Sequence, residues 1–233
     1  MAQYFTKEQF YLNFIADDRF VKYILGGLKT TLLLTFLAIL LGVALGFLVG
    51  IVRATHDRTG KLLILDLPCR AYLSVIRGTP VVVQLMIMYY CIFTAADTSK
   101  LFVGVLAFGI NSGAYVAEIF RSGIMSVDNG QFEAGRSLGF NYSQTIWYII
   151  MPQAIKNVLP ALCNEFIALL KETSVAGFIA MQELTKGGDI IRSRTYNPYL
   201  PLFTVAFVYW VVVTVLTSLV GRLEQRMRKN DVR

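Results

Sequence analysis

Two long stretches of this chain carry no charged residue, residues 30–52 and residues 195–221. A helix rises about 1.5 Å per residue, so either stretch can cross the roughly 30 Å hydrocarbon core of a bilayer. Only 16% of the residues are charged and 55% are apolar, whereas soluble domains carry roughly 25% charged residues. The sequence therefore predicts an all-α membrane protein. It excludes a soluble enzyme, a disordered chain and a small disulfide-bonded secreted module.

The formal net charge of +7 does not indicate a nucleic-acid-binding protein. The basic residues stand between and beyond the apolar stretches, where membrane topology accounts for them, so we expect no nucleic-acid partner. The three cysteines, Cys69, Cys91 and Cys163, include no close pair, and His56 is the single histidine. We therefore interpret the cysteines as packing residues and expect no metal site.

The apolar segments predict about five membrane-spanning helices within one transmembrane domain, residues 23–222. Pro80 is expected to start the second span, because proline in the first turn of a helix costs no hydrogen bond and Gly78 permits a break before it. We expect Asp66, Pro68 and Arg70 to keep the preceding segment away from lipid. The spans are predicted at residues 24–52, 80–93, 101–120, 158–180 and 199–219.

Residues 1–22 are predicted to form a helix along the membrane surface, because Phe10, Tyr11, Phe14 and Ile15 recur at helical spacing. Lysine and arginine are concentrated in the connector after the first span, the loop after the third and the C-terminal end. Cytoplasmic segments carry such an excess, so we expect an external N-terminus and a cytoplasmic tail at residues 223–233.

Gly42, Gly46 and Gly50 lie at four-residue spacing in the first span and leave one helix face without side chains. This pattern favours a close contact with another helix. The alternative is that glycine is simply common in membrane helices.

The expected cytoplasmic loop at residues 122–157 is long and not very polar. Its apolar run at residues 146–151 is too short to span a bilayer, so we expect it to pack beneath the spans or to dock into another protein. Gly130 and Gly139 bracket one short predicted helix. The segment from Asn141 is predicted to cap a second helix that ends before Pro152.

The order Glu133-Ala134-Gly135, Gly139, Ile149 and Met151-Pro152 in this loop resembles the Glu-Ala-Ala signature of permease subunits of ATP-binding-cassette (ABC) importers. Gly135 replaces the second alanine and Met151 replaces the usual leucine. The resemblance covers nearly the whole chain. Residues 77–80, 111–119 and 164–174 are similar to the polar-amino-acid branch of that family.

The resemblance implies a type I importer permease, multi-pass in the cytoplasmic (inner) membrane of a prokaryote. It would pair with a second permease subunit, the same or homologous, receive amino acid from an extracytoplasmic binding protein and couple to a cytoplasmic ABC ATPase dimer. The coupling residues would be Glu133, Ala134, Gly139, Asn141, Tyr142 and Trp147. The alternative for two of them is that Glu133 caps its own helix and Gly139 ends it.

We expect no enzyme activity and no cofactor in this chain. A phosphate-binding loop needs a glycine, four further residues and then Gly-Lys-Ser/Thr. The only Gly-Lys pair, Gly60-Lys61, has Leu62 after it and Thr55 where the first glycine should be. ATP and Mg would be bound by the partner ATPase.

Polar side chains at membrane depth are expected to face a cavity or a partner. Asn111, Tyr115 and Glu118 share one helix face, and Glu165 lies on a second face of small and acidic residues. We predict that these residues and Arg77 bind a polar, possibly basic, amino acid. The alternatives are that Glu118 pairs with Arg121, that Glu165 is structural and that Arg77 binds carbonyl groups at the break before Pro80.

Two functions of different classes remain at this point. The first is a transport subunit whose ATPase is separate. The second is a non-transporting structural or assembly subunit of another membrane complex, which the apolar spans permit equally well. The loop at residues 133–152 favours transport, because an assembly subunit has no need of it.

Overall fold

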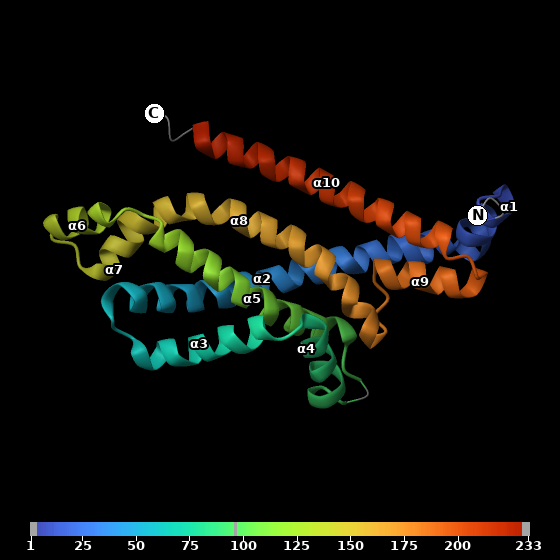
Figure 1. The fold of residues 1–233 in the computed structure, drawn as a ribbon, viewed down its shortest axis with the longest axis horizontal. Coiled ribbons are helices and arrows are strands. Elements are labelled where there is room, and N and C mark those ends of the chain that lie inside the picture. Colours follow the sequence, from blue (N-terminus) through green and yellow to red (C-terminus); the bar gives the residue numbers. More distant parts are fainter. Residues whose placement is uncertain (1–3, 96, 230–233) are drawn as a thin grey trace.

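The computed structural model describes residues 4–95 and 97–229, and every regular element in that part of the chain is a helix (Figure 1). The all-α prediction is therefore confirmed. The α-helices are α1 (Lys7–Phe10), α2 (Gly26–Thr59), α3 (Leu63–Gly78), α4 (Val81–Ile87), α5 (Lys100–Met125), α6 (Asn129–Ser137), α7 (Tyr142–Thr145), α8 (Met151–Glu172), α9 (Leu184–Thr195) and α10 (Tyr199–Lys229). Wider or tighter helical turns link several of them, at Tyr11–Ile15, Ala16–Asp18, Phe20–Leu25, Met88–Ile92, Ile146–Ile150 and Thr173–Ile179.

The contact between α2 and α5 forms the centre of the molecule (Figure 1). Gly42, Gly46 and Gly50 are all buried on the α2 side. A Cβ added to Gly46 would lie 2.5 Å from Cγ1 of Val116, and one added to Gly50 would lie 2.7 Å from Cβ of Phe120. The predicted close helix contact on the glycine face is confirmed, with α5 as its partner.

Length and composition identify three candidate membrane spans among the described residues: Phe20–Thr59, Lys100–Met125 and Tyr199–Met227. Leu63–Gly78 and Val81–Ile92 meet at 105° and together form a fourth candidate. The helix expected at residues 158–180 does not qualify by itself, because polar residues lower its mean hydropathy. It is present as α8, which lies against α5 and α10.

Several predicted span boundaries need correction. The segment from Pro80 to Phe93 cannot be a span by itself, because Val81–Ile92 would reach only about 18 Å. α5 continues past Arg121 to Met125. α8 ends at Glu172, where tighter turns replace the predicted remainder of the fourth span. α10 extends to Lys229, so most of the predicted tail continues the helix, while residues 230–233 lie outside the described residues.

Two predictions about short helices are also wrong in part. The second loop helix does not end before Pro152, because the wider turn at Ile146–Ile150 joins α7 directly to α8. Pro152 lies in the first turn of α8, where its missing N–H is tolerated. The N-terminal segment is not one helix, since Asp17 and Asp18 have φ of 55° and 52° and break it. It lies against α9, where Thr195 Oγ1 donates a hydrogen bond to Asn13 Oδ1 at 2.8 Å.

Candidate functional site

The loop after α5 folds into two short helices that pack on each other. The side chain of Asp128 accepts a hydrogen bond from the Gly130 N–H at 2.6 Å and so caps α6. A Cβ on Gly135 would lie 2.7 Å from Cγ2 of Thr145 in α7. Glycine in place of the second alanine of the signature therefore gives room for the Thr145 side chain where α6 and α7 approach each other.

The predicted coupling residues end and cap these helices. Gly139 has φ of 80° and follows the last turn of α6. It therefore ends this helix, as the alternative interpretation of Gly139 predicted. Glu133 does not cap its own helix, because Asp128 does. Asn141 and Gln144 cap α7 reciprocally, with each side chain accepting at 2.9 Å from the backbone N–H of the other residue. The predicted cap at Asn141 is confirmed.

The apolar run of the loop has a buried side and an exposed side. Ile146, Ile150 and Met151 are buried in a cluster with Ala54 of α2 and Ile124 of α5. The other side is exposed, including Trp147 and Tyr148, which are 50% and 71% exposed. Glu133 and Ala134 are exposed as well. The loop is thus anchored beneath the spans and still offers a surface to a partner.

Arg58 at the end of α2 holds the loop in place, and sequence reasoning missed it. Its Nη1 donates a hydrogen bond to Asn129 Oδ1 at 2.6 Å, and its Nη2 donates to the carbonyl of Val127 at 3.2 Å. The guanidinium carbon lies 3.9 Å from the centre of the Phe132 ring. One side chain therefore connects α2 to the end of α5 and to α6.

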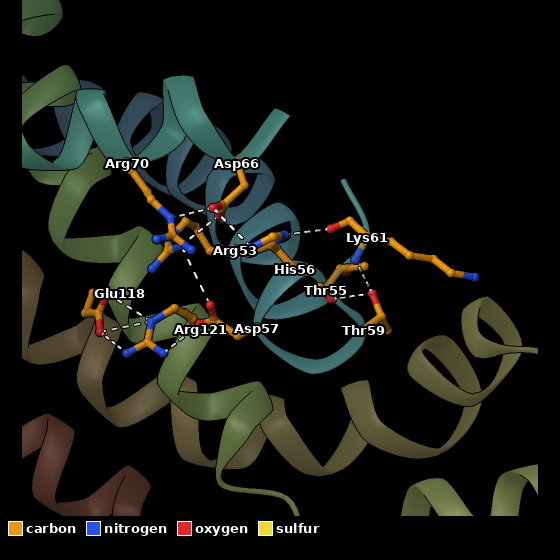
Figure 2. A network of polar contacts seen from close by, with 10 residues as sticks. All are labelled: Arg53, Thr55, His56, Asp57, Thr59, Lys61, Asp66, Arg70, Glu118 and Arg121. Atoms are coloured by element: carbon orange, nitrogen blue, oxygen red, sulfur yellow. Dashed lines mark hydrogen bonds and ion pairs between the residues drawn. The ribbon is translucent and has the colours of Figure 1, made fainter. Parts of the chain in front are cut away.

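An ion-pair network joins α2, α3 and α5 (Figure 2). Asp66 is fully buried and pairs with Arg53 at 2.7 Å and with Arg70 at 2.5 Å. Arg121 pairs with Asp57 at 3.1 Å and also with Glu118. This geometry favours the structural alternative for Glu118.

The five predicted substrate residues do not form one cluster. Glu118 and Arg77 line a cavity of about 440 Å³ together with Arg53 and Arg70. The Arg77 guanidinium lies 5.6 Å from the centre of the Tyr115 ring.

Asn111 and Glu165 have separate partners, which local sequence patterns do not reveal. Asn111 Nδ2 donates to Gln84 Oε1 at 3.0 Å, and Ser112 Oγ donates to Glu165 Oε1 at 2.7 Å. Gln84 in turn donates to the carbonyl oxygens of Ile76 and Thr79 across the break between α3 and α4. The role suggested for Arg77 as the side chain that binds carbonyls at this break therefore belongs to Gln84.

A buried carboxyl group outside the spans was also missed. Glu183 precedes α9 and is fully buried, and its side chain accepts hydrogen bonds from the backbone N–H groups of Lys186 at 2.6 Å and Thr185 at 2.7 Å. Burial raises the pKa of Glu183 to about 7.

The candidate spans, the bent α3–α4 pair and the structured loop after α5 describe a helical membrane protein. The profile of binding-protein-dependent transport system inner membrane components matches residues 38–229, and the chain belongs to this family. It is therefore a multi-pass membrane protein.

Among its relatives is a putative glutamine transport system permease protein, GlnP, of Rickettsia felis, which is 32% identical over 90% of this chain and 95% of that protein. The arginine transport system permease protein ArtQ of Bacillus subtilis is 34% identical over 94% of this chain and 99% of that protein. A crystal structure described as an amino acid ABC transporter with histidines shares 40% identity, with a TM-score of 0.82 over 91% of this chain and 98% of that one. An inward-facing structure of the MetNI methionine ABC transporter, 18% identical with a TM-score of 0.78, shares the fold over 89% of this chain and 97% of that one.

Proposed function

We propose that this chain is the permease subunit of an ATP-driven importer of polar amino acids in the cytoplasmic membrane of a prokaryote. The observation that carries the proposal is the loop at residues 133–152, which is anchored on α2 and α5 and exposes Glu133, Ala134 and Trp147. A rigid helical loop of this kind transmits a displacement from a cytoplasmic motor to the spans. Relatives named for glutamine and arginine support polar amino acids as the substrate class.

The partners follow from this role. A cytoplasmic ABC ATPase dimer binds ATP and Mg and contacts the loop, a second permease subunit completes the pathway, and an extracytoplasmic binding protein delivers the amino acid. The N-terminus is then external and the helix α10 ends in the cytoplasm. This chain itself performs no hydrolysis.

The substrate site in this proposal has two parts, which lie at different heights along α5. Asn111 and Glu165, with Gln84 and Ser112, supply hydrogen-bonding groups and a carboxylate between α4, α5 and α8. Tyr115 and Glu118 lie further along α5, where Glu118 and Arg77 of α3 line the arginine-rich cavity and the Arg77 guanidinium approaches the Tyr115 ring. Glu165 is the group best suited to a positive charge on the amino acid, because it accepts a hydrogen bond from the neutral Ser112 hydroxyl, whereas Glu118 already faces Arg121.

The proposal is tested by purifying the complete complex with its binding protein in proteoliposomes and measuring ATP hydrolysis with each amino acid in turn. We expect stimulation by one or more polar amino acids and accumulation of the same amino acids in the vesicles. If no amino acid stimulates hydrolysis or is taken up, a structural or assembly role replaces the transport role.

A further inference from the structure

A cavity of about 400 Å³ lies where the end of α2 meets the loop helices α6 and α7. The walls that matter for its chemistry are Lys61 and Leu62 after α2, Phe132 and Arg136 on α6 and Tyr142 on α7. It is separate from the residues proposed above for substrate, and of the predicted coupling residues only Tyr142 lines it. The cavity therefore requires an explanation of its own.

Two positive charges line this cavity without an acidic partner. Neither the Lys61 ammonium nor the Arg136 guanidinium forms an ion pair or a side-chain hydrogen bond with any described residue, and both residues are exposed. The Tyr142 hydroxyl is buried and likewise has no hydrogen-bond partner in the described chain. A ligand that satisfied this cavity would carry negative charge and hydrogen-bond acceptors.

An exposed apolar surface continues directly from the basic one. Leu62, Leu63, Ile64 and Leu65 follow Lys61 and are 42%, 53%, 86% and 53% exposed. A lysine next to exposed leucine and isoleucine side chains is typical of the membrane interface, where the ammonium lies among headgroups and the apolar side chains among acyl chains. The ligand is thus expected to be anionic at one end and apolar at the other.

We propose that this cavity binds the headgroup of an anionic phospholipid. The phosphate lies between Lys61 and Arg136, and the acyl chains run along the exposed face at Leu62–Leu65. The start of α3 then meets lipid, contrary to the expectation from the sequence that Asp66, Pro68 and Arg70 keep this segment away from it. Basic pockets between membrane helices bind anionic headgroups in the same way, through charge at short range. Only the assignment to the inner leaflet rests on the proposed function, and the binding itself does not.

A lipid in this position would connect the end of α2 to α6 through Lys61 and Arg136. It would act beside Arg58, which makes the direct protein contact between the same two helices. Anionic lipid is therefore expected to stabilise the position of the loop relative to the spans.

The test is native mass spectrometry of the intact complex, released from nanodiscs of phosphatidylcholine with or without phosphatidylglycerol. The variant Lys61→Gln/Arg136→Gln removes both charges from the cavity. The control Lys7→Gln/Lys29→Gln removes two exposed positive charges elsewhere, neither of which forms an ion pair with a described residue. Melting temperatures verify that both variants are folded.

We expect wild type and control to retain phosphatidylglycerol in preference to phosphatidylcholine. The cavity variant should lose affinity for phosphatidylglycerol by about 30-fold, which corresponds to about 1 kcal/mol for each removed charge. Arg136→Gln alone should lose about fivefold by the same conversion.

Three results would overturn the proposal. The first is equal retention of phosphatidylglycerol by wild type and the cavity variant. The second is retention of phosphatidylcholine at the same level as phosphatidylglycerol. The third is displacement of the bound lipid by inorganic phosphate, which would assign the cavity to a soluble anion. Because no transport or hydrolysis is measured, failure here leaves the proposed function unaffected.

Discussion

The helices α5 and α10 are both long enough to span a membrane, but their surroundings are opposite. α5 is the less apolar of the two and most of its span is buried, whereas α10 is more apolar and almost none of its span is buried. Phe203, Phe207 and Trp210 on α10 are all more than 60% exposed. Of these two helices, the more apolar one is the more exposed.

The difference shows where polar groups are used. The interior of a membrane protein accepts small and polar residues if they pack closely and are hydrogen-bonded, and the lipid-facing surface does not. Asn111 and Ser112 are buried on α5 and paired with Gln84 and Glu165, and the glycines of α2 make room for this face. α10 has the composition of a surface that meets lipid or a second subunit.

The largest effect is expected from filling the contact between α2 and α5. Gly46→Leu places a side chain where even a Cβ lies 2.5 Å from Val116 and 2.8 Å from the backbone nitrogen of Ala117, so the subunit should lose about 1–3 kcal/mol of stability through overpacking. The matched change Gly221→Leu on α10, where a Cβ meets nothing within 4 Å, should have little effect. Thermal unfolding in detergent measures both. A wild-type melting temperature for Gly46→Leu would remove the distinction between the two helices.

Substitutions in the loop should abolish or reduce transport while α5 and α10 stay folded. Gly139→Pro cannot adopt φ of 80° and removes an N–H that donates to the Arg136 carbonyl, and Glu133→Lys reverses a charge on the exposed side of α6. Uptake into proteoliposomes should fall strongly for the first and several-fold for the second, while membrane insertion and capture of the binding protein persist. Unchanged uptake in both variants would contradict the coupling role.

Arg58 should act on coupling rather than on binding. Arg58→Lys keeps the charge but loses the planar group that bonds Asn129 and Val127 and lies on Phe132. We expect more ATP hydrolysed per amino acid imported, by several-fold, with little change in substrate affinity. Arg222→Lys on exposed α10 is the control and should leave this ratio unchanged. If Arg58→Lys lowered hydrolysis and uptake equally, Arg58 would be structural only.

The sequence predicted features that depend on neighbours along the chain. Four-residue glycine spacing, the Asn141 cap and the amphipathic loop are local patterns, and the structure contains all three. The role of Arg58 is different, because its partner Asn129 is 71 positions away. A basic residue after an apolar span is fully explained by topology, so nothing in the sequence distinguished it from its neighbours.

The candidate substrate site was predictable only as a set of residues. Helical spacing correctly placed Asn111, Tyr115 and Glu118 on α5, but it could not show that Glu118 faces Arg121 and Asp57 while Asn111 faces Gln84. The break between α3 and α4 was visible at Gly78 and Pro80, but its angle of 105° depends on packing against α5. Partners supplied by distant helices decide which polar residues remain available to a ligand.

The variant Glu165→Gln tests the role of the α8 carboxylate that accepts a hydrogen bond from Ser112 on the buried polar face of α5. If Glu165 binds a basic side chain, uptake of arginine or lysine should fall several-fold more than uptake of glutamine, because only the former lose a charge partner. Equal loss for both classes would assign Glu165 to the ammonium group that all amino acids carry. Loss of melting temperature with an unchanged ranking of substrates would make it structural, since the Ser112 hydroxyl would then be its main partner. Preserved uptake of every substrate would remove Glu165 from the site.

The smallest effect is expected at Glu183, the buried carboxyl group that precedes α9. The pKa of this carboxyl is raised by burial to about 7, from 4.5. The folded protein therefore holds a proton that the unfolded chain has lost, so the contribution of this group to stability is greatest at low pH and decreases as the pH rises toward 7. Between pH 6 and pH 7 the decrease is about 1 kcal/mol.

Glu183→Gln keeps an oxygen that can accept hydrogen bonds from the backbone N–H groups at the start of α9, but the amide does not titrate. The melting temperature of this variant should therefore depend less on pH than that of wild type. Parallel pH profiles for the two proteins would mean that Glu183 stays ionised in the folded state, with its hydrogen bonds to the N–H groups of Thr185 and Lys186 outweighing its burial.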